Sequence, residues 1–100
     1  ADIAFVRGAS IERTMVVEGS FGGCMVLLDK SIADAGLACP ANNNWVSLDC
    51  DGVYVSKASA QRALDSAQMA LALGKNIHIQ VDDSKKHDNY CVAVRIDLMN

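Results

Sequence analysis

The sequence contains few aromatic residues, a single proline and no long apolar run. Aromatic residues make up 5% of the 100 residues, so a core must be built mainly from small aliphatic side chains. No apolar stretch approaches the roughly 18 residues that a membrane-spanning helix requires. Lys and Arg number 9 against 12 Asp and Glu, and the net charge of −3 offers no cationic excess for nucleic-acid phosphates. We therefore expect no transmembrane segment and no nucleic-acid partner.

The residues that are present suffice for one small domain. Hydrophobic residues make up 51% and charged residues 21%, which excludes a disordered or highly charged tail. A chain of this length forms one domain, and we assign residues 1–100 to it. Apolar burial in so small a domain gives marginal stability, so additional covalent or subunit contacts are expected.

Four cysteines occur without a Cys-x-x-Cys pair, which excludes a zinc ribbon and a thioredoxin-like redox motif. An even number in a short chain favours disulfides over the alternative, four free thiols packed as small apolar groups. The chain begins at Ala1 rather than at an initiator Met, as a mature protein does after signal-peptide removal. We therefore expect a secreted or periplasmic protein.

Five segments have the composition or the alternation of β-strands. The first is expected at residues 11–18, and Gly8 is expected to break the short apolar stretch at residues 3–6. Residues 53–55 are also strand-like, either as a continuation of the third strand or as its hairpin partner. The other four strands are predicted at residues 24–28, 45–48, 77–82 and 91–98.

Glycines and polar residues mark the connections between these strands. Residues 19–23 contain three glycines and predict a hairpin-type turn. Residues 29–44 form a long irregular connection, and so long a loop in a compact domain is usually functional or pinned, here through Cys39. Residues 83–89 are strongly polar and predict a solvated hairpin loop.

Residues 56–74 predict an amphipathic helix. Ser56 or Ser59 can cap its N-terminus, and Gly74 stands where a helix commonly ends in the left-handed conformation. One face carries apolar residues at helical spacing, namely Ala60, Ala63, Leu64, Ala67, Ala70 and Leu71. Small side chains on this face favour a close approach to a sheet.

The predicted order is β-β-β-α-β-β, which is the order of an OB-fold. The predicted fold class is therefore a β-rich α+β protein, a five-stranded OB-like Greek-key barrel with one amphipathic helix. Because the third and fifth strands of such a barrel are neighbours, we predict a Cys50–Cys91 disulfide. Cys24 and Cys39 bracket the second strand and its long loop, so we predict a second bond between them.

One segment of the chain resembles a known family. Ala63-Leu64-Asp65-Ser66-Ala67 runs through Gly74-Lys75 into Ile77-His78-Ile79-Gln80-Val81, within residues 61–83. In a small secreted chain with this element order, the segment resembles the OB-fold B subunits of AB5-type bacterial toxins, of the subtilase-cytotoxin kind. The resemblance covers about a quarter of the chain. It implies a ring-forming, glycan-binding subunit without catalytic activity of its own.

Two acidic clusters are candidates for acid–base or metal chemistry. Asp49 and Asp51 flank Cys50, but Asp and Gly in this order are typical of a turn. The second cluster could hold a metal through one histidine and two carboxylates, although a solvated hairpin tip is the favoured interpretation. Its members are Asp82, Asp83, His87 and Asp88, with Lys85 and Lys86 between them. We expect no catalytic residue, no metal and no cofactor.

Trp45 is the only tryptophan, and it follows three asparagines. An aromatic face beside amides suits sugar recognition, so Asn43, Asn44 and Trp45 are the candidate ligand-binding residues, with a core tryptophan as the alternative.

The expected function is a non-catalytic secreted binding module, an oligomeric glycan-binding subunit in its most specific form. The alternatives are a periplasmic or secreted inhibitor or accessory protein that binds one protein partner, and a small hydrolase that uses the acidic clusters. Self-association is expected through the barrel edges and the helix, where Met69 and Ala72 lie off the main apolar stripe.

Overall fold

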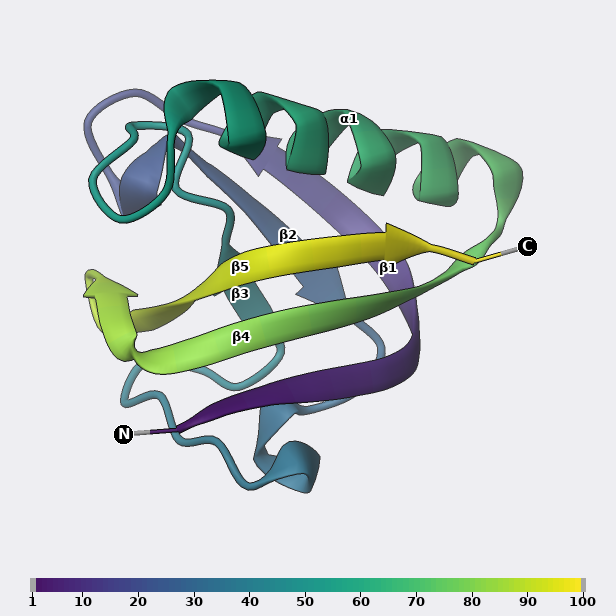
Figure 1. The fold of residues 1–100 in the computed structure, drawn as a ribbon, viewed down its shortest axis with the longest axis horizontal. Helices are drawn as coiled ribbons and strands as arrows, with labels where there is room; N and C mark the ends of the chain where they lie inside the picture. Colours follow the sequence, from purple (N-terminus) through teal and green to yellow (C-terminus); the bar gives the residue numbers. More distant parts are fainter. Residues whose placement is uncertain (1, 100) are drawn as a thin grey trace.

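The computed structural model describes residues 2–99 and confirms the predicted fold class (Figure 1). Five strands form a closed barrel in the order β1-β2-β3-β5-β4, and one helix lies between β3 and β4 in the chain. The elements are β1 (Ile3–Val16), β2 (Cys24–Leu28), β3 (Trp45–Ser47), α1 (Lys57–Leu73), β4 (Asn76–His87) and β5 (Tyr90–Leu98), with short 3-10 turns at Phe21–Gly23 and Ile32–Ala35. This is an OB-like arrangement.

β1 is longer than predicted because Gly8 bends the strand instead of ending it. The register against β4 shifts between Val6 and Ala9, and Gly8 has a φ of +66° that an L side chain rarely adopts. The long strand β1 pairs with two neighbouring strands. Residues on both sides of the bend, from Ile3 to Ser10, pair with β4, and residues from Ile11 to Val16 pair with β2.

The β4–β5 hairpin is also tighter than predicted. β4 continues through the polar segment to His87, and only Asp88 and Asn89 form the turn, with φ of +52° and +69°. Asp and Asn are the residues other than glycine that best tolerate this region, so a two-residue turn is accessible to them. The predicted loop at 83–89 is therefore wrong. The strand-like residues 53–55 form no strand either, and their N–H groups bind Asp49 instead.

Helix α1 follows the prediction closely. The Ser56 side chain accepts a hydrogen bond from the Ser59 N–H, and Gly74 ends the helix in the left-handed conformation. The buried face packs on the core with Ala60, Leu64, Ala67 and Ala70. Leu71, which was assigned to the same stripe, is 41% exposed.

The predicted disulfide pairing is wrong. The structure links Cys24 to Cys50 and Cys39 to Cys91, with Cα–Cα distances of 5.5 and 5.7 Å. β2 and β3 are antiparallel, so the start of β2 lies beside the end of β3, and the Leu48 N–H donates to the Cys24 carbonyl at 3.0 Å. The segment that follows β3, which contains Cys50, therefore lies beside the start of β2 and not beside β5.

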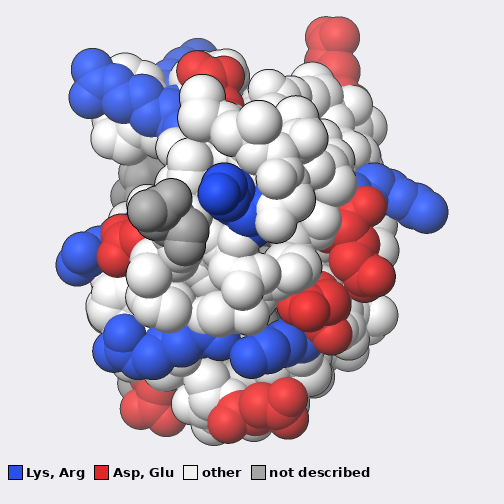
Figure 2. Space-filling model, turned by 90° about the vertical axis from the view of Figure 1, so that its right-hand side faces the viewer, with Lys and Arg blue, Asp and Glu red and all other residues white. Residues whose placement is uncertain are grey.

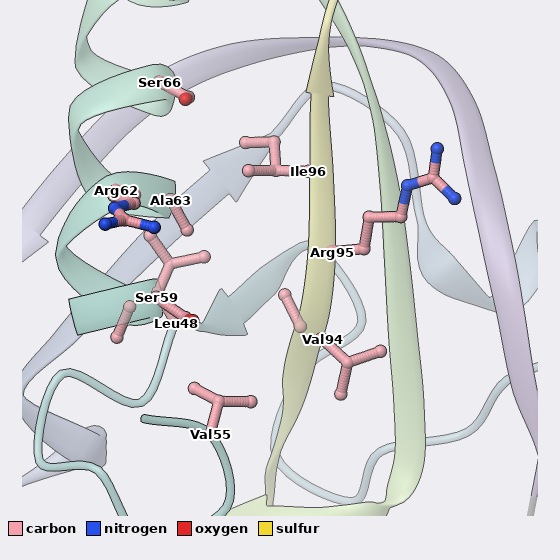
Figure 3. A pocket seen from close by; sticks show the side chains of 11 residues that line it. Leu48, Val55, Ser59, Arg62, Ala63, Ser66, Val94, Arg95 and Ile96 are labelled. Carbon is pink, nitrogen blue, oxygen red and sulfur yellow. The ribbon is translucent and has the colours of Figure 1, made fainter. Parts of the chain in front are cut away.

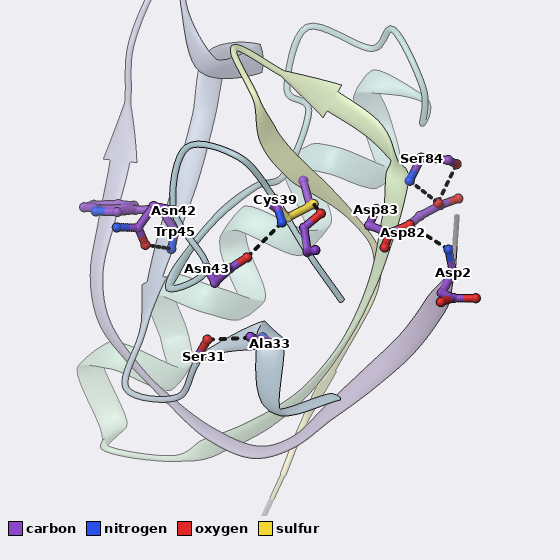
Figure 4. The surroundings of a disulfide bond; sticks show 12 residues. Asp2, Ser31, Ala33, Cys39, Asn42, Asn43, Trp45, Asp82, Asp83 and Ser84 are labelled. Carbon is purple, nitrogen blue, oxygen red and sulfur yellow. Dashed lines mark hydrogen bonds between the residues drawn. A yellow bond between two sulfur atoms is a disulfide. The ribbon is translucent and has the colours of Figure 1, made fainter. Parts of the chain in front are cut away.

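The long connection at residues 29–44 supplies the other bond. It crosses to the β4–β5 turn, where the Ala41 N–H donates to the Asn89 carbonyl at 3.2 Å. This crossing places Cys39 against Cys91 at the start of β5 (Figure 4). The loop is thus pinned through Cys39 as expected, but to a different partner. The predicted neighbourhood of the third and fifth strands is confirmed by the pair Ser47↔Val92.

The surface carries both signs of charge. On the face turned toward the viewer in Figure 2, cationic and anionic side chains are interspersed, and neither sign covers the face alone. Within residues 2–99, no helix is long and apolar enough to cross a membrane.

Candidate functional site

Trp45 lies on the outer surface of the β1–β2–β3 part of the barrel. It opens β3 and pairs with Leu27 of β2, which in turn pairs with Arg13 of β1. The two strand pairings thus place Arg13, Leu27 and Trp45 in one row across three strands. Trp45 and Leu27 are half-buried and Arg13 is exposed, and the Arg13 guanidinium carbon lies 6.0 Å from the Trp45 ring centroid. The apolar ring surface of Trp45 and the cationic guanidinium of Arg13 are therefore adjacent on this face.

The asparagines before Trp45 shape the loop that presents it. The Asn42 side-chain oxygen accepts the N–H groups of Asn44 at 2.7 Å and Trp45 at 3.3 Å. Asn43 accepts the Cys39 N–H at 2.9 Å, and the Asn44 amide donates to the Leu28 carbonyl at 3.4 Å. Figure 4 shows the Trp45 ring beside Asn42 and directed away from the Cys39 disulfide.

The predicted site residues are therefore adjacent but have different roles. Asn43 and Asn44 use their side chains to hold the loop, whereas Trp45 offers ring surface. Sequence reasoning missed Arg13, which comes from a strand far away in the sequence. The signal that could have found it is register, because the antiparallel pairing of β1 with β2 and of β2 with β3 determines which residue lies two strands from Trp45.

A second polar group of interest is buried between the end of β3 and the end of β4. Asp49 is fully buried and lies 2.6 Å from Nε2 of His87. Its carboxylate also accepts the N–H groups of Val53, Tyr54 and Val55 at 3.2, 2.6 and 2.9 Å. Burial raises the pKa of Asp49, but these N–H donors and His87 outweigh it, and the pKa lies below its ordinary value.

Neighbouring side chains complete this group. The Ser47 hydroxyl donates to the Phe21 carbonyl at 2.8 Å and accepts the Asp49 N–H at 3.1 Å. The Tyr54 ring meets the His87 ring edge-on, with centroids 5.2 Å apart. Ser47, His87 and Asp49 have the residue types of a hydrolytic triad, but the serine proton is directed to a backbone carbonyl and the serine is fully buried. We call these three residues with Tyr54 the Asp49 cluster.

The predicted acidic clusters are dispersed in the structure. Asp51 is exposed, whereas Asp49 is fully buried. Asp82 accepts hydrogen bonds from Ser84 and the Lys85 ammonium, the latter at 2.7 Å, and Lys85 and Ser84 lower its pKa to about 2. Asp83 accepts the N–H of Asp2 at 2.6 Å.

Asp88 and His78 also accept hydrogen bonds from backbone groups that are distant in the sequence. Asp88 accepts the Phe21 N–H at 2.8 Å, and Nδ1 of His78 accepts the Gly8 N–H at 2.9 Å. Across residues 2–99, no three His, Cys, Asp or Glu side chains gather as a metal ion would require.

Comparison of the chain with protein-family models, curated proteins and solved structures found no match.

Proposed function

We propose that this protein is a non-catalytic, secreted or periplasmic binding module for carbohydrate, and that the row Arg13–Leu27–Trp45 is its binding face. The observation that carries the proposal is the guanidinium of Arg13, whose carbon lies over the half-exposed ring of Trp45 at 6.0 Å from the ring centroid. A sugar ring stacks on an indole through its apolar face, and a guanidinium binds a carboxylate through two parallel hydrogen bonds. The ligand class that fits both is an acidic sugar.

Three further observations support this proposal. Two disulfides suit an oxidising compartment, where a small module needs covalent cross-links. The carboxylate–imidazole pair of the Asp49 cluster is committed to backbone donors, so it supports the barrel rather than a reaction. The position of Trp45 is also fixed, because the preceding asparagine loop is held by its own hydrogen bonds and by the Cys39–Cys91 disulfide. A preformed face loses little entropy on binding.

Self-association belongs to the same proposal. Met69 and Leu73 lie one turn apart on α1 and are 54% and 61% exposed, and Ala72 is exposed beside them. A neighbouring subunit that covered this strip would add the apolar burial that a domain of this size lacks. Sedimentation equilibrium at micromolar concentration tests this part, and a monomer there would refute it.

A glycan array that includes sialylated, uronic-acid and neutral glycans tests the ligand class. We expect signal for acidic glycans, loss of all signal in Trp45→Ala, and loss of the preference for acidic over neutral glycans in Arg13→Gln. Arg7→Gln is the matched control, because the Arg7 guanidinium lies 4.8 Å from the Phe5 ring on another part of the barrel. Absence of signal on the whole array, or equal losses in the Arg7 and Arg13 variants, would contradict the proposal.

A further inference from the structure

The part of β5 after Val92 has one edge that no other strand of residues 2–99 covers. On one side it pairs with β4 along most of its length, from Ile77↔Leu98 to His87↔Tyr90. On the other side its register with β3 consists of the single pair Ser47↔Val92. Within the described chain, the residues of β5 after Val92 have no strand partner on that side. Backbone groups on such an edge are a template for another strand.

The free backbone groups of this edge can be assigned. The Met99 N–H donates to the Asn76 carbonyl at 2.9 Å, so the backbone of Met99 faces β4. Consecutive residues of an antiparallel strand present their backbone groups to opposite sides. The N–H and C=O groups of Leu98 and Ile96 therefore face away from β4, two residues apart, which is the spacing that an added strand uses.

A groove runs beside this edge, between β5 and α1 (Figure 3). Its volume is about 270 Å³, and its apolar lining includes Leu48, Val55, Ala63, Val94 and Ile96. Val94 is the extra residue of a bulge, since Gln80 pairs with Arg95 and Val81 with Ala93. Figure 3 shows Ile96 of β5 directed toward Ala63 of the helix, while the side chains of Val94 and Arg95 project to the other side of the strand.

The rim of the groove on α1 is polar and cationic. Ser59, Arg62 and Ser66 line it, one helical turn apart. Arg62 is exposed and forms no salt bridge within the described residues, whereas Arg95 is paired with Asp97 at 2.9 Å. The groove thus offers an unpaired cation on the helix opposite unpaired backbone groups on the strand.

We propose that an extended acidic peptide segment of a partner protein binds in this groove by adding a strand to the free edge of β5. Its backbone pairs with Ile96 and Leu98, its alternate apolar side chains enter the space between Ala63 and Ile96, and an Asp or Glu side chain pairs with Arg62. Strand addition beside a helix obtains affinity from the backbone bonds and specificity from the alternate side chains. A lone extended segment fits better than the edge of a second barrel, because α1 runs alongside β5 (Figure 1) and leaves only the groove between them.

The probe for this proposal is a phage-displayed library of random peptides of about seven residues, which at about 3.3 Å per residue can run the length of the free edge. Selection on the folded, disulfide-bonded protein is expected to enrich apolar residues at every second position together with Asp or Glu. The enriched peptide is then synthesised for titration. Enrichment without this alternation, or no enrichment, would overturn the proposal.

Two measurements locate the bound peptide. Arg62→Glu is expected to weaken binding about tenfold or more, because the acidic side chain then faces a like charge. The matched control is Gln61→Glu, an exposed neighbour outside the groove, which should change affinity less than about twofold. In amide exchange, binding should slow exchange at Ile96 and Leu98 and leave Met99 unchanged. Equal effects of the two variants, or protection elsewhere on the barrel, would refute the assignment.

The glycan and peptide proposals fail separately. Trp45→Ala should abolish glycan binding and leave peptide binding unchanged, since the Trp45 row does not line this groove. Arg62→Glu should weaken peptide binding and leave glycan binding unchanged.

Discussion

The two boundaries of β5 are built in different ways. Toward β4 the strand has a long antiparallel ladder, whereas toward β3 it has one registered pair. Near that single pair, a disulfide and a side-chain hydrogen bond connect the neighbouring segments in place of a backbone ladder. Cys91 at the start of β5 is bonded to Cys39 of the long loop, and Asp49 after β3 holds His87 at the end of β4. The comparison teaches that this barrel closes through side chains and a covalent bond where the backbone ladder is missing.

The largest expected effect comes from removing the covalent link at the β3–β5 boundary. Replacing Cys39 and Cys91 with Ser opens a loop with a sequence separation of 52 residues. The chain-entropy model gives a loss of about 4 kcal/mol in the free energy of unfolding. Urea denaturation followed by circular dichroism measures it.

The matched control removes the other disulfide, Cys24–Cys50, whose separation is 26 residues. It should cost about 3.5 kcal/mol by the same model. It joins β2 and β3, which already pair through several residues, so its loss is partly compensated. If this control destabilises the protein more than the Cys39–Cys91 variant, the β3–β5 boundary does not depend on its covalent link.

The second prediction concerns the Asp49 cluster at the same boundary. Asp49→Asn removes the charge that three backbone N–H groups and His87 surround. Replacing a buried carboxylate leaves its hydrogen-bond donors poorly paired, which costs about 3 kcal/mol, and urea denaturation should show this loss. Asp51→Asn, two residues away and exposed, should stay within about 0.5 kcal/mol. Similar losses for both variants would show that the cluster does not hold the barrel closed.

Sequence patterns predicted the elements that depend on local signals. The helix from its serine cap to Gly74, the alternating strands β4 and β5, and the element order all follow from periodicity and capping. The position of β3 beside β5 in the barrel was predicted from the order of the elements alone. The helix and the strands could be predicted because each is decided by residues close together in the chain.

Features that depend on residues far apart were missed. The Asp49–His87 pair joins residues separated by 38 positions, and neither residue has a local signal that names the other. The disulfide pairing depends on which strand end meets which loop, and the antiparallel register of β2 and β3 would have been needed to assign Cys24 to Cys50. The proximity of Arg13 to Trp45 was missed for the same reason, since it also depends on the register of β1, β2 and β3. The bend at Gly8 was interpreted as a break because a glycine within a strand pattern weakens the strand and gives no local signal that pairing resumes beyond it.

The third prediction tests how α1 covers the barrel near the weakly paired boundary. Ala67 is fully buried on the helix face that packs against the core, so Ala67→Leu forces extra volume into a filled space. Overpacking costs about 1–3 kcal/mol. Gln68→Leu adds an apolar side chain at the next, exposed position and should be nearly neutral. Thermal unfolding followed by circular dichroism compares them, and equal shifts in Tm would mean that the packed face is misassigned.

The smallest expected effect separates the two boundaries by pH. Asp49 belongs to the β3–β5 boundary and Asp82 to the β4–β5 ladder, where it pairs with Val92, and both carboxyls have lowered pKa values. A carboxyl whose pKa is lower in the folded state stabilises the fold above its unfolded pKa, and this contribution is lost as the pH falls through the folded pKa. For Asp82 the window runs from 3.8 down to about 2.

Asp82→Asn should therefore flatten the loss of stability across that window. Its cost at neutral pH should be about 1 kcal/mol or less, because Lys85, its ionic partner, is partly exposed to solvent. Asp49→Asn should also flatten the acid limb, but from a much less stable starting point at neutral pH. Urea denaturation at several pH values between 5 and 2 distinguishes the variants. If the slope for Asp82→Asn equals that of the unmodified protein, the Lys85–Asp82 pair contributes nothing to the ladder, and the acid sensitivity belongs to the β3–β5 boundary alone.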